Sequence, residues 1–412
     1  MRLPVALLAA LTLGACTDGG GSGALLVTND EDALEARVTY SDTPLTLEAP
    51  AAKGRAKVAA KPAKADDLSL TLVAEVTPPQ YDGVTLQANE VRVRGRRAYV
   101  AYNVRGATYL GGIDVFDISD PTRPRLISSA LLPGRDVNGI TVKNHRLYLV
   151  GASDDADLTT PAFLGAIALR GGKLTDTFTQ RDLPSYAGTD VDVAGPYLYA
   201  TSGDTGGAVS VYRLPGLSLV RSEAVDDARG VDADRLDVAV VAGTPARLFV
   251  FDRDAASLTA QHTLSGATIP ESKSTVEVKR RKAVLALGDG GTQVVCLADG
   301  SVLARLDPPT VADLDPSVTV TNAASAYRRA IFMANGEAGV YVAMADSNLN
   351  GRDCEVDNLE VVGRIRFGDL QSANHVVYRH DLLFVAAGTG GLKIVAVTDA
   401  GADPDDDDED DD

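Results

Sequence analysis

The segment from Asp346 to Asp357 has the oxygen-bearing side chains and the spacing of a calcium-binding loop. Asp346, Asn348 and Asn350 stand at its positions 1, 3 and 5, Gly351 at position 6 and Asp357 at position 12. Such a loop wraps hard oxygen ligands around one ion, and the glycine permits a sharp turn. Position 12 is Asp where Glu is usual, which shortens its reach, and a polar turn between strands is the alternative interpretation. The pattern predicts a calcium site formed by Asp346, Asn348, Asn350 and Asp357.

A second group of polar residues recurs at regular intervals, where strands are expected to begin. It comprises Asn89, Asn138, Asp190, Arg229, Asn322, Asn374 and His375, together with Asp204, Asp289 and Glu337 from three turns. If these positions meet at one opening, they line a pocket for a polar ligand. Asn and Thr also bond nearby backbone at strand starts, which is a structural alternative.

The elements that would position these residues form a repeat of about 48 residues. Its most regular part is a short apolar strand that occurs seven times. The aligned centres are Tyr99, Tyr148, Tyr199, Val240, Leu285, Phe332 and Phe384, with spacings of 49, 51, 41, 45, 47 and 52 residues. Glycine-containing hairpins connect most of these strands to a third strand, as tight turns require. Evenly spaced short strands of this kind are typical of a β-propeller.

The last repeat lacks a fourth strand. Its third strand, Gly391 to Val397, is followed directly by an acidic tail, whereas Leu68 to Val76 has the fourth-strand pattern and precedes the first repeat. An N-terminal strand that completes the last sheet closes a propeller ring and protects its edges. We predict an all-β fold, a seven-bladed β-propeller of four-stranded blades over residues 68–400, closed by this N-terminal strand.

The first repeat resembles a known family. Gly112-Ile113-Asp114-Val115-Phe116-Asp117-Ile118-Ser119-Asp120-Pro121-Thr122-Arg123-Pro124 is similar to the LVIVD repeat of bacterial surface β-propellers. The later repeats keep the hydrophobic frame but lose the Ser-Asp-Pro turn. The resemblance implies an exported propeller and supplies no catalytic residues.

Motifs of the common enzyme classes are not found in the sequence. It has no Gly-x-Ser-x-Gly elbow, no paired zinc histidines and no Cys-x-x-Cys. We therefore expect a non-enzymatic binding or scaffolding module, with a protein or carbohydrate ligand at one propeller face. The alternative is a calcium-dependent hydrolase or lactonase that uses carboxylates at the mouth of the central channel.

The N-terminus predicts export. Residues 1–15 read as a lipoprotein signal peptide, because Arg2 precedes an apolar run too short to span a bilayer, and Leu13-Gly14-Ala15-Cys16 resembles a lipobox. An ordinary secretory signal with a chance cysteine is the alternative. Lipid on Cys16 would anchor the chain to a membrane, and Thr17 after it favours the bacterial outer membrane. Residues 16–67 are predicted to be a tether and linker, with an isolated hairpin as one interpretation of Leu25 to Leu47.

The chain is strongly acidic, with a formal net charge of -18. Residues 401–412 contain nine acids, and such a run is expected to be disordered, serving as a solvating tail or binding cations loosely. The negative charge argues against nucleic acid as the main partner. We expect a monomer.

The remaining two cysteines, Cys296 and Cys354, are an even pair for an oxidising compartment. Neighbouring repeats could bring them together as a disulfide. Otherwise Cys296 is a small buried hydrophobic residue.

Overall fold

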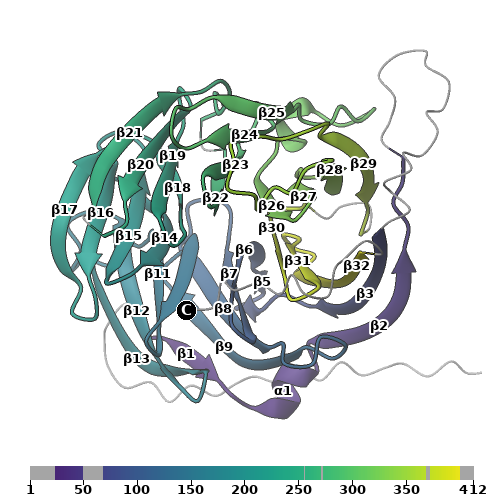
Figure 1. Ribbon diagram of the computed structural model, residues 1–412. Coiled ribbons are helices and arrows are strands. Elements are labelled where there is room, and N and C mark those ends of the chain that lie inside the picture. Colours follow the sequence, from purple (N-terminus) through teal and green to yellow (C-terminus); the bar gives the residue numbers. More distant parts are fainter. Residues whose placement is uncertain (1–23, 50–67, 255, 271, 368–371, 400–412) are drawn as a thin grey trace, which may run out of the picture.

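The computed structural model describes residues 24–49, 68–254, 256–270, 272–367 and 372–399 of the chain. Its seven blades surround a central channel, which confirms the predicted propeller (Figure 1). The predicted signal peptide, Cys16 and the acidic tail lie outside the described residues. No helix within the described ranges is long and apolar enough to cross a membrane.

Each blade is an antiparallel sheet, and in blades one to six its four main strands follow chain order from the channel outward. Blade one contains β6 (Gln87–Arg94), β7 (Arg97–Asn103), β8 (Leu110–Asp117) and β9 (Arg125–Pro133). Blade two contains β10 (Gly139–Lys143), β11 (Arg146–Ala152), β12 (Ala162–Arg170) and β13 (Lys173–Asp182). Blade three contains β14 (Ala187–Ala194), β15 (Tyr197–Gly203), β16 (Ala208–Arg213) and β17 (Ser218–Ala224). Blade four contains β18 (Ala228–Ala233), β19 (Asp237–Ala242), β20 (Arg247–Asp252) and β21 (Ser257–Thr263).

The other three blades repeat this arrangement. Blade five contains β22 (Thr275–Lys279), β23 (Lys282–Ala286), β24 (Thr292–Cys296) and β25 (Val302–Leu306). Blade six contains β26 (Ala323–Tyr327), β27 (Ala330–Ala334), β28 (Val340–Met344) and β29 (Glu360–Ile365). Blade seven contains β30 (His375–Arg379), β31 (Leu382–Ala386), β32 (Leu392–Asp399) and β3 (Leu68–Val76). The connections hold a small hairpin of β4 (Gln80–Tyr81) and β5 (Val84–Thr85) and a 3-10 turn, η2 (Pro316–Val318).

The strand β3 closes the ring as the sequence predicts. It pairs antiparallel with β32, with Leu70 opposite Val397 and Val76 opposite Leu392. Blade seven therefore joins the N-terminal part of the chain to its C-terminal part, so that the ring has no open boundary.

Seven hydrophobic clusters fill the spaces between neighbouring blades. The cluster between blades seven and one, for example, packs Phe384 and Ile394 against Val91 and Phe116, all completely buried. Each strand can bury both faces in this way, which explains the nearly continuous apolar character of the second and third strands.

The prediction for residues 24–49 is wrong, because they form neither a tether nor a hairpin. The strand β1 (Leu26–Thr28) pairs with β9 as a fifth strand of blade one, and β2 (Val38–Leu45) pairs with β3 as a fifth strand of blade seven. Between them lies the helix α1 (Glu31–Glu35). The outer strands β9 and β3 would otherwise leave backbone groups unpaired, and β1 and β2 form hydrogen bonds with these groups.

Side chains from the same segment fix it to the ring. Leu34 is buried in the cluster between blades seven and one. Arg37 lies 2.5 Å from the fully buried Asp114 and also donates to the carbonyl of Thr77. Asp114 belongs to the segment that resembles an LVIVD repeat, and its carboxylate pairs with Arg37 in this chain.

Candidate functional site

The innermost strands line the central channel with stacked layers of side chains. Because alternate residues of a strand point to the same side, every second residue faces the channel. The middle layer consists of Arg92, Thr141, Asp192, Asp232, Glu277 and Ser325, one from each of blades one to six. A cavity of about 330 Å³ lies among these strands.

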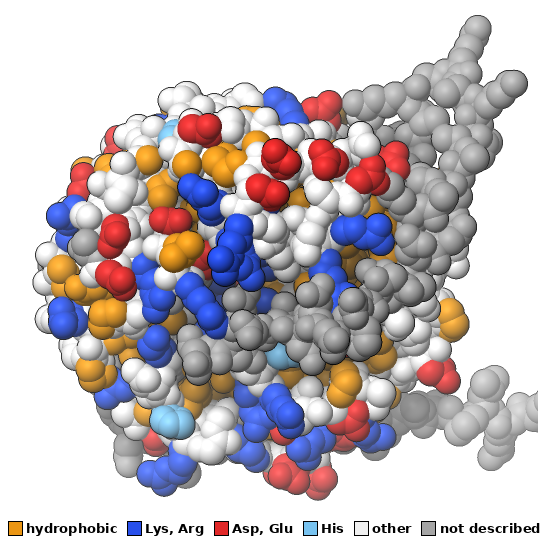
Figure 2. Space-filling model, in the orientation of Figure 1, with side chains coloured by type: hydrophobic (Ala, Val, Ile, Leu, Met, Phe, Trp, Pro, Cys, Tyr) orange, Lys and Arg blue, Asp and Glu red, His pale blue; other side chains and the backbone are white. Residues whose placement is uncertain are grey.

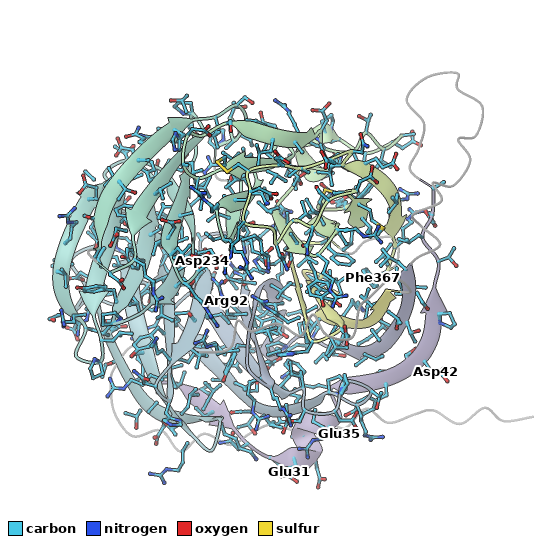
Figure 3. The ribbon with its side chains drawn as sticks, in the orientation of Figure 1. Glu31, Glu35, Asp42, Arg92, Asp234 and Phe367 are labelled. Atoms are coloured by element: carbon cyan, nitrogen blue, oxygen red, sulfur yellow. A yellow bond between two sulfur atoms is a disulfide. The ribbon has the colours of Figure 1, made fainter. Side chains whose placement is uncertain are left out.

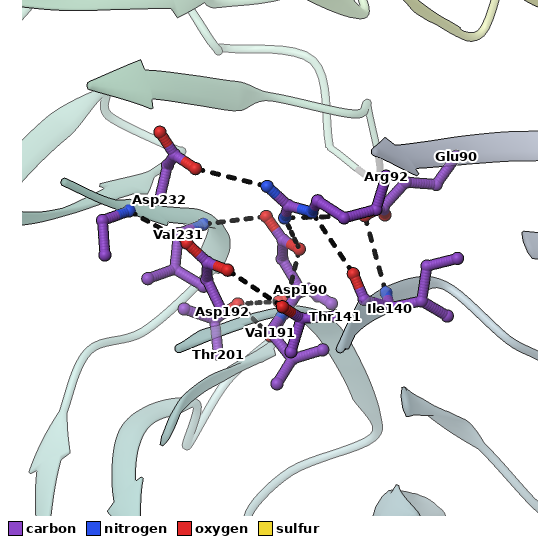
Figure 4. Close-up of polar contacts among 12 residues, drawn as sticks. Glu90, Arg92, Ile140, Thr141, Asp190, Val191, Asp192, Thr201, Val231 and Asp232 are labelled. Carbon is purple, nitrogen blue, oxygen red and sulfur yellow. Dashed lines mark hydrogen bonds and ion pairs between the residues drawn. The ribbon is translucent and has the colours of Figure 1, made fainter. Parts of the chain in front are cut away.

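Arg92 crosses the channel and organises this layer (Figure 4). Its guanidinium lies 3.2 Å from Asp232 of blade four and 3.5 Å from Asp190 of blade three, and it donates to the carbonyl of Ile140. These contacts tie together blades that are far apart in the sequence. The contacts also compensate part of the charge of the carboxylates that surround Arg92.

Backbone groups stabilise the same carboxylates. Asp190 accepts from the N–H groups of Val191 and Val231, and Asp232 accepts from the N–H of Val278. The carboxylate of Asp192 is bonded by Thr141 and by a backbone N–H. Each acid in the channel thus has donors within the fold.

Burial changes the protonation of these groups. Burial and the nearby Asp190 raise the pKa of Glu90 to about 8, against the opposing effect of Lys273 and Arg92. Burial likewise raises the pKa of Asp232 well above its usual range. Burial and the positive charges of Lys273 and Arg92 lower the pKa of His375 well below its ordinary value, so this imidazole is neutral at pH 7.

The channel is bridged at one end by Lys273. This residue lies in the connection into blade five, and its Nζ donates to the carbonyl of Asn89 in blade one at 2.7 Å. The same ammonium is 3.8 Å from Glu90. The cavity is instead lined by residues of the turns between first and second strands, at the other end of the channel. The cavity therefore opens on the face opposite to the one from which a polar mouth was predicted.

We call the face that carries the turns between first and second strands the basic face. Six of its cations line the cavity: Arg94, Lys143, Arg235, Arg253, Lys279 and Arg379. Figure 2 shows Lys and Arg side chains gathered around the middle of this face, and Figure 3 places Arg92 and Asp234 in the same region. In a chain of net charge -18 this local excess of positive charge is unexpected.

Several of these cations are not neutralised by neighbouring acids. Arg94, Lys143 and Arg379 form no ion pair with another residue in the part of the chain that the structure describes. Burial and repulsion from Arg94 and Arg253 lower the pKa of Lys143. The carboxylate of Asp234, which also lines the cavity, accepts from two backbone N–H groups of its own turn.

Arg253 carries an unused donor at this rim. Its Nη1 donates to the carbonyl of Arg235, whereas its Nε is buried and has no hydrogen-bond partner among the described residues. A buried N–H without an acceptor costs free energy. The rim of the cavity therefore has both excess charge and a donor that an anionic group could satisfy.

The opposite face, which we call the clasp face, holds most of the residues predicted to bind a ligand. The recurrence of polar residues at these strand starts has a structural explanation, because five of the side chains there donate a hydrogen bond to the backbone of the next blade. The bonds run from Asn89 to Val137, Asn138 to Gly188, Thr189 to Ala228, Asn322 to Ala373 and Asn374 to Ala88, at 2.8 to 3.2 Å. The last of them joins blade seven to blade one. The structural alternative accounts for this ring, although the carbonyls are those of the next blade and not of the local turn.

Arg229 takes the corresponding role between blades four and five. It is 7% exposed, pairs with Asp227 through both guanidinium Nη2 and Nε, and donates to Ser272 and Ser274. Its donors are used within the fold. Among the predicted ligand residues, only Asp190 and His375 line the cavity.

The three predicted acids of the turns are separated from the cavity. Asp204, Asp289 and Glu337 lie between second and third strands, on the clasp face. Asp289 is bonded by the N–H and the hydroxyl of Thr268, and Glu337 borders a hollow of about 10 Å³. None of the three lines the cavity with His375.

The predicted calcium loop follows β28, and the side-chain oxygens of Asp346 and Asn348 already have protein partners. Asp346 accepts from the amide of Asn358 at 2.7 Å, and Asn348 accepts from the N–H of Asn350 at 2.9 Å. The side-chain oxygen of Asn350 is buried without a partner in the described part of the chain. Asp357 interacts with Asp346 through backbone groups. No three His, Cys, Asp or Glu side chains among the described residues are grouped to hold a metal ion.

Two other interactions hold this loop against blade five. The fully buried Lys282 donates to the carbonyls of Gly351 and Asp353 at 3.0 and 2.6 Å. A disulfide joins Cys296 to Cys354, so the pairing that the sequence left open is present. The loop thus lies fixed on the same face as the cavity.

The rim cations were not predicted, because most of them lie where the first strands end, whereas the predicted ligand residues lie mainly where these strands begin. Their signal is nevertheless visible in the short turns Arg94-Gly95-Arg96, Lys143-Asn144-His145, Lys279-Arg280-Arg281 and Arg379-His380. Basic residues in equivalent turns of a ring meet around its axis. A comparison of charge at equivalent repeat positions would have predicted a basic mouth.

No family model and no curated protein sequence matches the chain. Solved structures do. RRP9 WD40 repeats match at a TM-score of 0.57 and 13% identity, over 85% of this chain and 99% of that chain. U3-55K matches at 0.55 and 13%, over 78% and 97% of the two chains, and the Dos1 propeller at 0.52 and 9%, over 87% and 94%. At such low identities the similarity concerns the fold, and the chain is a seven-bladed β-propeller similar to WD40 propellers.

Proposed function

We propose that this chain is a non-enzymatic binding module that holds an acidic segment of a partner protein at its basic face. The observation that carries the proposal is the rim of Arg94, Lys143, Arg253 and Arg379 around the cavity. These cations form no ion pair with their neighbours among the described residues, so an anionic ligand can pair with them without breaking an existing ion pair. The WD40-like fold is typical of binding modules, which supports a protein partner.

The deeper layer of the channel explains why the ligand would stay at the rim. Asp192 and Glu277 lie below it and would repel a second acidic group. An extended acidic segment that lies across the opening suits this distribution of charge better than an acidic group that enters the channel. Repulsion of this kind also contributes specificity.

A fluorescence anisotropy titration with a labelled octaglutamate peptide tests this function. The full chain should bind at low salt, and the triple variant Arg94→Gln/Lys143→Gln/Arg379→Gln should bind at least about tenfold more weakly. The matched control replaces three exposed arginines away from this face: Arg105→Gln, Arg221→Gln and Arg366→Gln. An equal loss of peptide affinity in both triple variants would mean that binding depends only on the overall charge of the protein, and the proposal would then be wrong. Preference for a neutral oligosaccharide or an oligonucleotide would point to a different ligand class.

The cellular setting remains a proposal that rests on the N-terminus. We propose that Cys16 carries lipid and anchors an LVIVD-like propeller at the bacterial outer membrane or cell surface. The disulfide between Cys296 and Cys354 supports export, because such bonds persist in oxidising compartments. Replacing Cys16→Ala should abolish fatty-acid labelling and release the protein from membranes. A variant that stays membrane-bound would contradict this address.

Calcium at the blade-six loop is a finer part of the proposal. The unpartnered oxygen of Asn350 supports it, with Asp346, Asn348 and Asp357 as further ligands. Extracellular sites of this kind bind at about 0.1 to 1 mM, so calcium would raise the melting temperature only slightly. Asp346→Asn should remove that response. The comparison needs a chain with a neutralised acidic tail, since the tail could bind calcium by itself. A calcium-independent melting curve there, or a calcium-dependent hydrolytic activity that Asp346→Asn abolishes, would contradict the proposal.

A further inference from the structure

The described part of the chain ends close to the basic rim. The strand β32 runs toward the basic face, and the N–H of Val397 donates to the carbonyl of Asp381 in the turn between β30 and β31. The chain therefore leaves the ring beside Arg379, one of the rim cations. The next residues are the acidic segment 400–412.

We propose that the acidic C-terminal segment, residues 400–412, binds the basic rim of its own propeller and competes there with acidic partners. The inference rests on the proposed function, because it assigns a first occupant to the same site. Nine of these 13 residues are acidic. The rim offers Arg94, Lys143, Arg253 and Arg379 as complementary cations.

Length permits this contact. Thirteen extended residues reach at most about 43 to 47 Å, so the segment can extend from the end of β32 across the opening of the channel. Covalent attachment gives such a segment an effective concentration in the millimolar range. A partner in solution must therefore compete with a ligand that is always present.

The unmet interactions at the rim favour this occupant. Lys143 lies where Arg94 and Arg253 repel it, and the Nε of Arg253 has no acceptor among the described residues. Carboxylates placed between these groups would reduce the repulsion and satisfy the donor. The acids of the deeper layer would keep the segment at the surface, from which a stronger acidic ligand can displace it.

The first experiment compares the full chain with a full-length variant whose acids at 403 and 405–412 are changed to Asn or Gln. Octaglutamate should bind this tail-neutral variant at least about tenfold more tightly than the unchanged chain, because the competing ligand is gone. A synthetic peptide of residues 400–412 should also bind the tail-neutral chain, and Arg94→Gln/Lys143→Gln/Arg379→Gln should weaken both peptides. The Arg105/Arg221/Arg366 triple should retain binding within about twofold.

The outcomes separate the two proposals. Equal octaglutamate binding by the unchanged and tail-neutral chains would overturn the inference and leave the proposed function intact. No binding to the tail-neutral chain at low salt would overturn both. Zero-length carbodiimide cross-linking of the unchanged chain supplies a direct readout, with Lys143 expected to join an acid of residues 403–412 within one molecule. Cross-links from the tail to other lysines only would also contradict the inference.

Discussion

The two faces of this propeller use the same residue type for opposite purposes. On the clasp face, Arg229 is nearly buried, pairs with Asp227 and bonds two serines of the next blade. On the basic face, Arg94 is exposed and has no ion pair within the described residues. Satisfied donors stabilise a fold, whereas unsatisfied charge at a cavity is available to a ligand. The difference shows that recurrence of polar residues in a ring does not by itself identify the binding face.

The largest effect should come from removing the arginine of the clasp face. Arg229→Ala removes the guanidinium that binds Asp227 and the two serines of the connection into blade five, and breaking such a largely buried pair typically costs about 3 to 5 kcal/mol. Chemical denaturation should show this loss in the free energy of unfolding. Arg94→Ala is the matched substitution on the basic face and should change stability by at most about 0.5 kcal/mol. Similar losses in both variants would remove the contrast between the faces.

A smaller loss is expected at the closure of the ring. Asn374→Ala removes one bond to the carbonyl of Ala88, which keeps the N–H of Gly388 as its other donor, so we expect a loss of about 0.5 to 1.5 kcal/mol. Thermal denaturation should detect it, while octaglutamate binding should not change. A variant with native stability and weakened peptide binding would assign Asn374 to a ligand site, as the sequence first suggested.

The channel between the two faces should make stability depend on pH. The pKa of Glu90 is raised from 4.5 to about 8 by burial and by Asp190, with Lys273 and Arg92 opposing. The folded chain then keeps a proton that the unfolded chain has released. This contribution to stability is complete below about pH 4.5 and is lost as the pH rises toward 8, with a slope of at most about 1.4 kcal/mol per pH unit.

Denaturation between pH 6.5 and 8 tests this slope, because His375 is neutral in both states over most of that range. Glu90→Gln should flatten the curve and remain folded at pH 7. Asp136, whose pKa burial raises to about 7, contributes a slope of the same sign, so Asp136→Asn is the companion variant. A slope that Glu90→Gln leaves unchanged would show that Glu90 is ionised in the folded chain.

The smallest effect concerns the rim itself. In the absence of ligand, Lys143→Gln should leave stability unchanged or raise it by a few tenths of a kcal/mol, because repulsion from Arg94 and Arg253 is relieved. The melting temperature in low salt is the measurement. A clear loss of stability would mean that Lys143 has a structural partner, and the basic face would then resemble the clasp face.

The sequence by itself determined the repeat, the number of blades and the closing strand. These features depend on apolar periodicity and on turn residues, which are local signals. The displaced copy at Leu68 to Val76 was sufficient to predict its pairing with β32. For Leu25 to Leu47 the pattern suggested at most an isolated hairpin, since it does not specify that the outer strands β9 and β3 are the pairing partners of this segment.

Only the tertiary structure decided which polar residues hold the ring together and which line the cavity. Asn89 and Arg94 belong to the same strand, yet one bonds the next blade and the other lines the cavity. The contact of Arg92 with Asp232 joins residues 140 positions apart. The disulfide between Cys296 and Cys354 likewise depends on how blades five and six are placed together. Periodicity describes each blade separately, whereas these contacts depend on the curvature of the whole ring, which brings distant strands together around one axis.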